Sequence, residues 1–280
     1  MREAAFDSIA AEYDREFTHT PLARVLRERV WSRLSANFKA GDHILELNCG
    51  TGEDAAWLAQ HGMTVVATDV STSMLAVAQQ KAQRVGVSHW IEIRWLDLTG
   101  AQMGLEAFTG SAWLAKPAKA SSPDRGSFDG VLSNFGGLNC VRDLRPLTTM
   151  LSEIVNPGGR LILVPMNRWC VWEIVWHLIH LRPRTAFRRL RQNGIDANIG
   201  SGKVHVWYPS IRSLRQVFGP TFKLRRVIGL GVFLPPSYLE SVVAKRPRLF
   251  NLLTRLERAT AARFPFNRLA DHVILEFEHR

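Results

Sequence analysis

The sequence predicts an α/β fold built on a mostly parallel sheet, and two observations support this class. Apolar, β-branched runs such as "MTVVATDV" at 63–70 are typical of strands buried on both faces. Helix-like segments of roughly a dozen residues separate these runs, and Gly62 and Gly86 close two of them. Because parallel strands need right-handed crossover connections, this alternation predicts helices on both faces of the sheet.

Each element is predicted from its periodicity and its end signals. Pro21 suits the first turn of a helix, and Ser71 is a typical N-cap. The expected helices span residues 3–15, 21–38, 53–61, 71–85 and 144–155. The expected strands span residues 43–47, 63–70, 89–98, 128–135, 156–166, 221–233 and 271–280. Residues 100–127, rich in small residues, lysine and proline, are expected to form a loop or a weak helix.

Four parts are expected along the chain. Residues 1–40 form N-terminal helices, 41–166 form a ligand-binding core, and 167–221 form a cap rich in tryptophan, arginine and histidine. Residues 222–280 complete the core with the sixth and seventh strands. A basic, mostly helical insertion at 232–270 separates these two strands.

Composition limits the class of protein. Apolar residues make up 46% of the 280 residues, enough for a buried core, and no apolar run is long enough to span a membrane. The N-terminal segment carries acids and no apolar stretch, so we expect no signal peptide and a cytoplasmic protein. The three cysteines are far apart, which predicts free thiols and no metal site.

The net charge of +11 favours anionic partners, namely nucleic acid, acidic lipid head groups or phosphorylated small molecules. Arginines cluster in "RPRTAFRRLR" at 182–191, and further basic clusters lie within 245–268. The alternative is a basic, solvated surface with no dedicated partner.

A glycine loop follows the first predicted strand, in "ILELNCGTGED" at 44–54. Together with Asp69, about 20 residues beyond it, this loop satisfies the G-x-G-x-x-[GA] dinucleotide pattern, so a nicotinamide cofactor (NAD) is one alternative. Asn48 stands where such loops more often carry glycine. Asparagine tolerates a positive φ better than most residues, so it can begin the turn.

The charges around the loop favour a different ligand. Glu46 precedes the loop, and Glu53 and Asp54 follow it. Three carboxylates suit a ligand with a cationic centre and an amino group better than a pyrophosphate. S-adenosyl-L-methionine, with its sulfonium and ammonium, has this chemistry.

The motifs resemble those of the Rossmann-like (class I) S-adenosylmethionine-dependent methyltransferases. "LELNCGTGEDAAWLA", "VVATDVSTSML", "WLDL", "FDGVLSNFGGLN" and "NPGGRLILV" are similar to the family's successive motifs, in its order. "FDSIAAEYD" resembles an N-terminal segment common in its small-molecule branch. The resemblance covers residues 6–166 and implies a seven-stranded Rossmann-like sheet with an antiparallel last strand and helical cap insertions after strands five and six.

The resemblance also implies a set of cofactor contacts. Asp69 would hold the ribose hydroxyls, Asp97 the adenine amine, and Tyr13 would close over the cofactor. The residues implied to bind the cofactor are Tyr13, Glu46, Asn48, Cys49, Gly50, Gly52, Asp69, Val70, Met74, Asp97, Leu98, Asn134 and Phe135.

The acceptor side is less defined. "SNFGGLN" lacks the proline pair of base-directed amino methyltransferases, and Gly136 and Gly137 are expected to leave room for a substrate. The catalytic residue is unknown; His177, His205 and Tyr208 are candidates for a general base, if the acceptor needs one.

The segment "WCVWEIVWHLIHL" at 169–181 places tryptophans and aliphatic residues at helical spacing, directly before the arginine cluster. An aromatic helix beside a basic one is typical of a peripheral membrane contact or a lid over an apolar substrate, and Trp172 and Trp176 would line the acceptor site. The alternative is a cap helix packed on the sheet.

The sequence therefore predicts a methyltransferase that acts on a small, lipophilic or anionic metabolite. An RNA methyltransferase is the alternative favoured by the charge, although the sequence contains no recognisable RNA-binding module. The oligomeric state and the methylated atom stay open.

Overall fold

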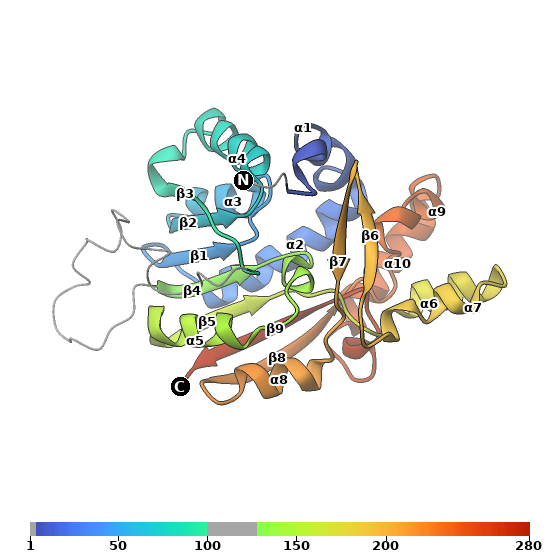
Figure 1. The fold of residues 1–280 in the computed structure, drawn as a ribbon. Helices are drawn as coiled ribbons and strands as arrows, with labels where there is room; N and C mark the ends of the chain where they lie inside the picture. The colour runs from blue at the N-terminus through green and yellow to red at the C-terminus, as the bar shows by residue number, and fades with distance from the viewer. Residues whose placement is uncertain (1–3, 100–127) are drawn as a thin grey trace.

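The computed structural model describes residues 4–99 and 128–280, so the loop expected at 100–127 lies outside the described residues. A seven-stranded sheet forms the centre, in the order β3-β2-β1-β4-β5-β9-β8 (Figure 1). Its strands are β1 (His43–Leu47), β2 (Thr64–Asp69), β3 (Ile91–Trp95), β4 (Phe128–Ser133), β5 (Val155–Leu163), β8 (Phe222–Leu230) and β9 (His272–His279). Strands β1 to β5 are parallel, and β9 is antiparallel to both of its neighbours. The predicted fold class is confirmed.

The strand order reverses at β1, which pairs with β2 on one side and β4 on the other. The connections that leave β1 and β4 therefore diverge, so the carboxyl ends of these two strands form the switch point of the sheet. Ligands of open α/β sheets bind at this position.

Helices cover both faces of the sheet, as predicted. The α-helices are α1 (Ala10–Tyr13), α2 (Pro21–Asn37), α3 (Glu53–Gln60), α4 (Thr72–Arg84), α5 (Arg145–Ile154), α6 (Val171–Ile179), α7 (Pro183–Ala186), α8 (Ile211–Phe218), α9 (Ser241–Ala244) and α10 (Pro247–Thr260). The Ser71 side chain accepts a hydrogen bond from the Met74 amide at 3.0 Å, so the predicted N-cap of α4 is confirmed.

Adjacent residues of the strands face two separate cores. Ile44 packs with α2 and α3, whereas Leu45 packs with α5 and α8. Three further pairs of adjacent residues are divided between the two cores in the same way: Val65 and Val66, Leu161 and Ile162, and Ile274 and Leu275. Continuous apolar runs are therefore required, because a strand covered on both faces has no solvent side.

The helix predicted at 3–15 is wrong in its extent. The structure divides this segment into a 3-10 turn, η1 (Asp7–Ile9), the single turn α1 and a π-helical turn, Asp14–Thr18. Residues Asp7 and Asp14 in these turns contact other elements through their side chains, as described below, so local periodicity does not decide their conformation.

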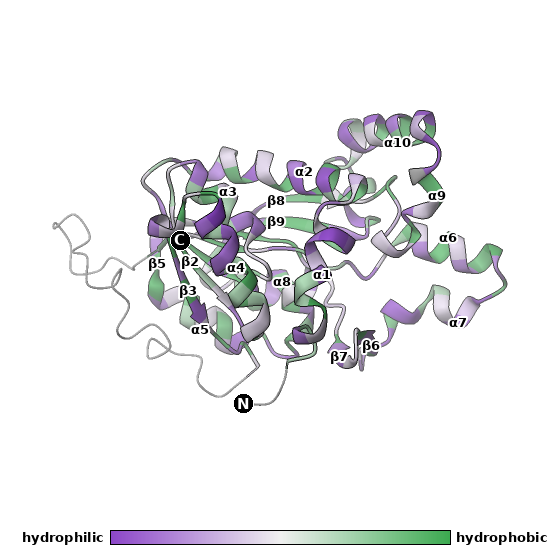
Figure 2. Ribbon diagram, turned by 90° about the horizontal axis from the view of Figure 1, so that it is seen from above, coloured by the Kyte–Doolittle hydropathy of each residue, from purple (hydrophilic) through white to green (hydrophobic). Residues whose placement is uncertain are grey.

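The cap at 167–221 is not all helical, which corrects the expectation of a helical insertion. Beyond α6 and α7 it forms an antiparallel hairpin, β6 (Ile195–Ile199) with β7 (Gly202–Val206). The arginine segment does not form one basic helix, because Leu181 (φ +56°) and Pro183 divide it from α6. Figures 1 and 2 show α6, α7, α9 and α10 at the same end of the molecule.

The hairpin contacts two segments that are far apart in the sequence, one near the N-terminus and one after β4. At its tip, the Ser201 amide donates to Ser8 Oγ at 3.3 Å, so the hairpin touches the N-terminal segment. At its base, the Trp207 amide donates to the Asn139 carbonyl at 2.8 Å, just after β4. The buried Asn139 side chain donates back to the Trp207 carbonyl at 2.7 Å.

Candidate cofactor site

The loop after β1 has the backbone that a close ligand contact requires. Asn48, Gly50 and Gly52 have φ values of +56°, +55° and +73°. The prediction that asparagine would adopt a positive φ at the first position is therefore confirmed. A Cβ built on Gly50 would meet no atom within 4 Å, so open space lies beside this residue.

Alanine substitution at the two loop glycines should destabilise the protein to different extents. A Cβ on Gly52 would lie 2.8 Å from the Cβ of Ala78 in α4, in addition to the strain of its positive φ. We expect Gly52→Ala to lower the free energy of unfolding by about 2–4 kcal/mol. Gly50→Ala, the matched control with open space, should cost about 1 kcal/mol. Equal urea midpoints for the two variants would contradict the predicted packing of the loop on α4.

Asp69 ends β2 and holds the loop in place. One carboxylate oxygen accepts from the Gly50 amide and the other from the Ser71 amide, both at 2.9 Å. Burial raises the pKa of this carboxyl group, although these hydrogen bonds oppose the shift. Asp69 therefore organises the loop and the start of α4 at once, next to the position expected for a ribose.

Glu46 differs from the other acids around the loop because, in the part of the chain that the structure describes, one of its buried oxygens has no hydrogen-bond donor. It is buried at the end of β1, and its Oε2 has no hydrogen-bond partner among the described residues. Burial raises the pKa of Glu46 well above its ordinary value, and the nearby Asp54 carboxylate adds to this effect. A buried carboxyl oxygen without a donor suits a ligand that brings a positive charge.

Asp54 is occupied by donors of the protein, so it is not one of three free carboxylates around the loop. It accepts from Arg27 Nη1 at 2.5 Å, Trp31 Nε1 at 2.7 Å and Asn134 Nδ2 at 2.8 Å. This buried hub joins α2, α3 and the end of β4. Burial opposes the charge of Arg27, but the Asp54 carboxylate raises its pKa above the ordinary value.

Glu53 is also engaged within the protein. Its carboxylate lies 2.6 Å from the buried ammonium of Lys81 in α4, which also contacts Asp14 at 2.7 Å. Asp14 in turn accepts from Thr51 Oγ1 at 2.6 Å. The N-terminal segment is thus fastened to the glycine loop through charges that the sequence does not reveal.

A second contact fixes the same segment. Asp7 accepts from Ser71 Oγ at 2.6 Å and from the Ser73 amide at 3.2 Å, at the start of α4. The half-buried Tyr13 lies between these two anchors in sequence, and burial raises the pKa of its hydroxyl. The contacts agree with an N-terminal segment that covers the loop.

Within residues 4–99 and 128–280, one group of side chains brings enough donor atoms together for a metal ion: Asp14, His19 and Glu53. The Lys81 ammonium already lies against both carboxylates, so part of the negative charge of this group is neutralised within the protein. The described cysteines Cys49, Cys140 and Cys170 are free thiols, as predicted, and burial raises the pKa of each.

The residues expected around the adenine lie at the ends of β2 and β3. Met74 and Leu98 are buried, and Asp97 is half-buried with its carboxylate on the Thr99 amide at 2.7 Å. The Val70 carbonyl accepts from Trp95 Nε1 at 2.8 Å. Their adenine contacts stay predictions.

At the end of β4, Phe135 occupies the position expected beside the methyl group. Its φ is +44°, the Arg27 guanidinium lies 4.8 Å from its ring centre, and His272 packs edge-on against it at 5.7 Å. Gly136 faces Met166, and a Cβ on Gly137 would overlap the Asn48 side chain. The space that Gly137 leaves is therefore filled by Asn48, and not by an acceptor.

The three candidates for a general base lie in the cap, and two of them are engaged there by other side chains. Both ring nitrogens of the exposed His205 are engaged, by Asp196 Oδ1 at 2.6 Å and the Asn193 carbonyl at 2.7 Å. Tyr208 packs against the Arg189 guanidinium. His177 in α6 is buried, which lowers its pKa, and its ring has no hydrogen-bond partner in the part of the chain that the structure describes.

The two tryptophans of α6 differ in their contacts. Trp172 Nε1 donates to the Phe233 carbonyl at 2.7 Å and so joins the two insertions. Trp176 packs on His180, with ring centres 4.3 Å apart. Both side chains are half-buried, and no described contact assigns them to an acceptor pocket.

A histidine that the sequence did not single out lies closer to the candidate methyl position. His272 begins β9, and its Nδ1 lies 3.0 Å from Oδ2 of the buried Asp271. Asp271 is paired with Arg189 at 2.7 Å, and Arg189 with Glu173 at 2.7 Å. Only the adjacency of Asp271 and His272 at a strand start was visible in the sequence.

The strand order, the glycine loop after β1 and the acid at the end of β2 define a Rossmann-like fold. Residues 45–163 match the family described as "Methyltransferase domain". This segment of the chain is therefore similar to a methyltransferase domain, and the sheet around it has the Rossmann-like order.

Two curated relatives and one solved structure extend this likeness. The chain is 30% identical over 160 residues to the demethylmenaquinone methyltransferase of Clavibacter sepedonicus, covering 57% of this chain and 56% of that protein. It is 26% identical over 173 residues to the chloroplastic 2-phytyl-1,4-beta-naphthoquinone methyltransferase of Arabidopsis thaliana, covering 60% and 58%. The chain thus spans less than two thirds of these relatives.

A solved structure agrees over more of the chain. The geranyl diphosphate C-methyltransferase from Streptomyces coelicolor superposes with a TM-score of 0.56 and 12% identity, over 96% of this chain and 84% of that one. At this identity the likeness shows the fold alone.

Proposed function

We propose that the protein transfers a methyl group from S-adenosyl-L-methionine to a small, lipophilic acceptor. The observation that carries this proposal is the buried Glu46 oxygen without a partner, beside a loop with open space at Gly50. The cofactor's ammonium would complete the hydrogen bonds of this carboxyl group. The match to a methyltransferase domain supports the same activity.

When bound, the cofactor supplies an activated methyl group, so the protein mainly has to hold and align the two ligands and exclude water. We assign the ribose to Asp69, the adenine to Asp97 and the closure of the site to Tyr13. The anchors of the N-terminal segment, Asp7 on α4 and Asp14 on Lys81, support this closure.

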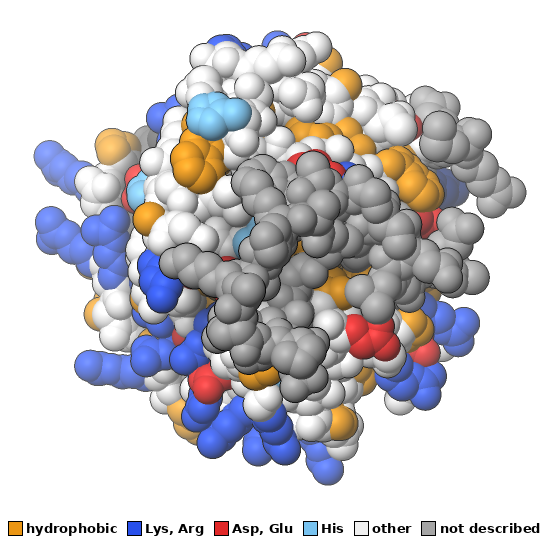
Figure 3. Space-filling view, turned by 90° about the vertical axis from the view of Figure 1, so that its left-hand side faces the viewer, with side chains coloured by type: hydrophobic (Ala, Val, Ile, Leu, Met, Phe, Trp, Pro, Cys, Tyr) orange, Lys and Arg blue, Asp and Glu red, His pale blue; other side chains and the backbone are white. Residues whose placement is uncertain are grey.

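We propose an aromatic acceptor of the quinol type. The names of the relatives support this class, and the Phe135 ring offers an aromatic surface at the end of β4. The RNA alternative has less support. On the face shown in Figure 3, Lys and Arg side chains gather along the left and lower edges with acidic and apolar side chains among them.

The test is methyl transfer from labelled cofactor. We expect label in chemically reduced 2-phytyl-1,4-naphthoquinone and in the lipid fraction of a cell extract. Label recovered in RNA would replace the quinol proposal with the RNA alternative. Calorimetry that detects a nicotinamide dinucleotide but no S-adenosylmethionine would contradict the methyltransferase proposal itself.

A quinol or phenol loses a proton on methylation, and we propose that His272 accepts it, with Asp271 stabilising the imidazolium. His272→Gln should lower kcat about 100-fold without changing cofactor affinity. A variant with wild-type kcat would exclude this role.

Cofactor binding is expected to depend on pH through Glu46. Because its pKa is raised in the free protein, the carboxyl group must lose a proton to pair with the cofactor's ammonium. Affinity should therefore weaken as the pH falls through that raised pKa, and binding should release a proton. Calorimetry in buffers of different ionisation enthalpy measures this release, which Glu46→Gln should abolish. Equal proton release by both proteins would contradict the role of Glu46.

We further propose a peripheral contact with the cytoplasmic membrane surface through the end of α6. Ile179 and Leu181 are 71% and 89% exposed, and Arg182 and Arg184 follow directly. Apolar side chains beside arginines suit an anionic bilayer. No helix of the described residues is long and apolar enough to cross a membrane. Co-sedimentation with phosphatidylglycerol vesicles should decrease in Ile179→Ser/Leu181→Ser, and unchanged binding would contradict this contact.

A further inference from the structure

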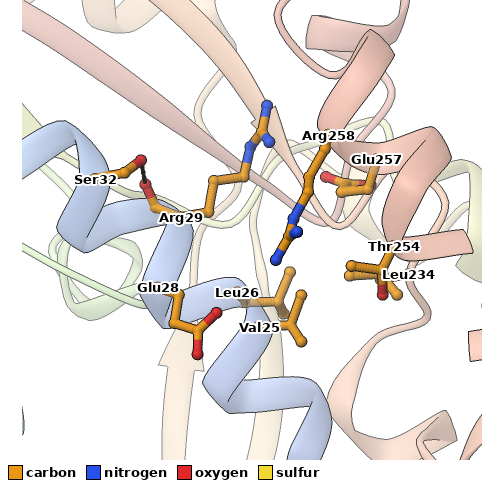
Figure 4. Close-up of a pocket in the computed structure, with 9 residues that line it drawn as sticks. All are labelled: Val25, Leu26, Glu28, Arg29, Ser32, Leu234, Thr254, Glu257 and Arg258. Atoms are coloured by element: carbon orange, nitrogen blue, oxygen red, sulfur yellow. Dashed lines mark hydrogen bonds between the residues drawn. The ribbon is translucent and has the colours of Figure 1, made fainter. Parts of the chain in front are cut away.

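A cavity of about 330 Å³ lies between α2 and α10, away from the glycine loop. Its lining residues are Val25, Leu26, Glu28, Arg29, Ser32, Leu234, Thr254, Glu257 and Arg258 (Figure 4). On α2, Arg27 and Trp31 face Asp54, whereas Arg29 lies two residues further along and points to the other side of the helix. The cavity and the candidate cofactor site therefore use opposite sides of α2.

Two arginines line this cavity, Arg29 from α2 and Arg258 from α10 (Figure 4). Among the described residues, neither Arg29 nor Arg258 forms an ion pair, and the buried Nε of Arg29 has no hydrogen-bond partner. Burial lowers the pKa of Arg29; Arg258 and Arg33 add to this effect, while Glu257 opposes it. Two cations that line one cavity repel each other, and the Glu257 carboxylate offsets this repulsion at Arg29 only in part.

Among the described residues, the acids of the cavity form no close ion pair with these arginines. The buried Glu257 carboxylate accepts from the backbone amides of Gly231, Val232 and Phe233 at 2.9, 2.8 and 2.8 Å, so it is held on the loop after β8. Glu28 is exposed on α2. The guanidinium donors thus remain available.

Val25, Leu26 and Leu234 give the cavity an apolar wall, and the hydroxyl-bearing Ser32 and Thr254 complete the lining. A site with two free guanidinium groups and an apolar wall fits a ligand that carries an anionic group on an apolar chain. The outer face of α10 also exposes Leu252 and Leu256. An amphiphile could therefore place its head group between the arginines while its chain follows apolar surface.

We propose that the cavity between α2 and α10 binds the phosphate group of an amphiphilic phosphate monoester, with Arg29 and Arg258 as its ligands. This site is independent of the proposed methyl transfer. Phosphatidic acid of a membrane and a soluble amphiphilic phosphate ester share this chemistry, and the probes below separate a phosphate that carries an apolar chain from bare phosphate.

The test is calorimetric titration of the full chain with dihexanoyl phosphatidic acid below its micelle concentration, and with inorganic phosphate. We expect one site for the lipid, with affinity reduced at least 10-fold in Arg29→Gln and in Arg258→Gln, and weaker binding of inorganic phosphate. Arg255→Gln on the exposed side of α10 is the control that removes the same charge, and it should bind like the wild type.

Three outcomes would overturn the proposal. These are no binding of the lipid, equal loss in the Arg255 variant, and binding of inorganic phosphate as tight as that of the lipid. Because Arg258 is exposed on α10, its substitution should leave the fold intact. Unfolding curves and cofactor affinity check this point for each variant.

Discussion

Replacing Asp54 by alanine is expected to lower the free energy of unfolding by about 3–5 kcal/mol. The substitution leaves the Arg27 guanidinium buried without its counter-ion. It also removes the acceptor of Trp31 Nε1 and Asn134 Nδ2, and each buried donor that is left unsatisfied adds to the cost.

Urea unfolding of the full chain measures this effect, and two variants control it. Asp54→Asn keeps an acceptor oxygen but not the charge, so its loss should be smaller. Asp143→Ala removes an acid whose ion pair with Arg145 is exposed, and it should leave the midpoint nearly unchanged. If Asp54→Ala were no more destabilising than Asp143→Ala, the hub would not be a stabilising contact.

Asp54→Ala should also disturb the residues proposed to lie beside the methyl group. Asp54 holds Asn134, and Arg27 covers the ring of Phe135. The conformation at the end of β4, with Phe135 at φ +44°, therefore depends on an ion pair between α2 and α3. A variant that still folds in the cold should methylate more slowly than the wild type at saturating cofactor.

The strands and the glycine loop were predictable because their causes are local. A strand covered on both faces must be apolar throughout, and a turn with positive φ accepts few residues besides glycine and asparagine. The conformation of Asn48 followed from these rules, and so did the positions of β1 to β5.

The pairing of the acids was not predictable, because it depends on contacts between distant segments. Glu53 and Asp54 looked like charges offered to a ligand, yet Lys81 and Arg27 neutralise them inside the protein. Glu46, whose Oε2 has no donor among the described residues, is therefore the acid that favours a cationic ligand.

The hairpin β6–β7 was not predicted, although its signal is local. Its sequence "IDANIGSGKVHVW" alternates apolar and polar residues around a glycine turn, which is a signal for a hairpin. The tryptophans and arginines before it directed attention to a helical cap. The hairpin is informative for function, because it joins Ser8 at one end to Asn139 at the other, across the edge where the ligands are proposed to bind.

Asp69→Ala is expected to weaken the binding of S-adenosylmethionine about 100-fold, through two separate losses. The carboxylate would no longer accept from the proposed ribose hydroxyls, and charge-assisted hydrogen bonds of this kind contribute about 1.5–3 kcal/mol each. The Gly50 and Ser71 amides would also lose their acceptor, so the loop and the start of α4 would no longer be fixed to β2.

Because of the second loss, Asp69→Ala should also lower the stability of the fold. An acid that contacts only the ligand would have no such effect. We expect the free energy of unfolding without cofactor to fall by about 1–3 kcal/mol, because two buried amides lose their partner. Asp69→Asn separates the two roles, since its amide oxygen can still accept from one backbone donor. Asn should therefore recover part of the stability but little of the affinity. Calorimetry and unfolding of the two variants measure both quantities, and cofactor affinity unchanged in Asp69→Ala would show that the ribose lies elsewhere.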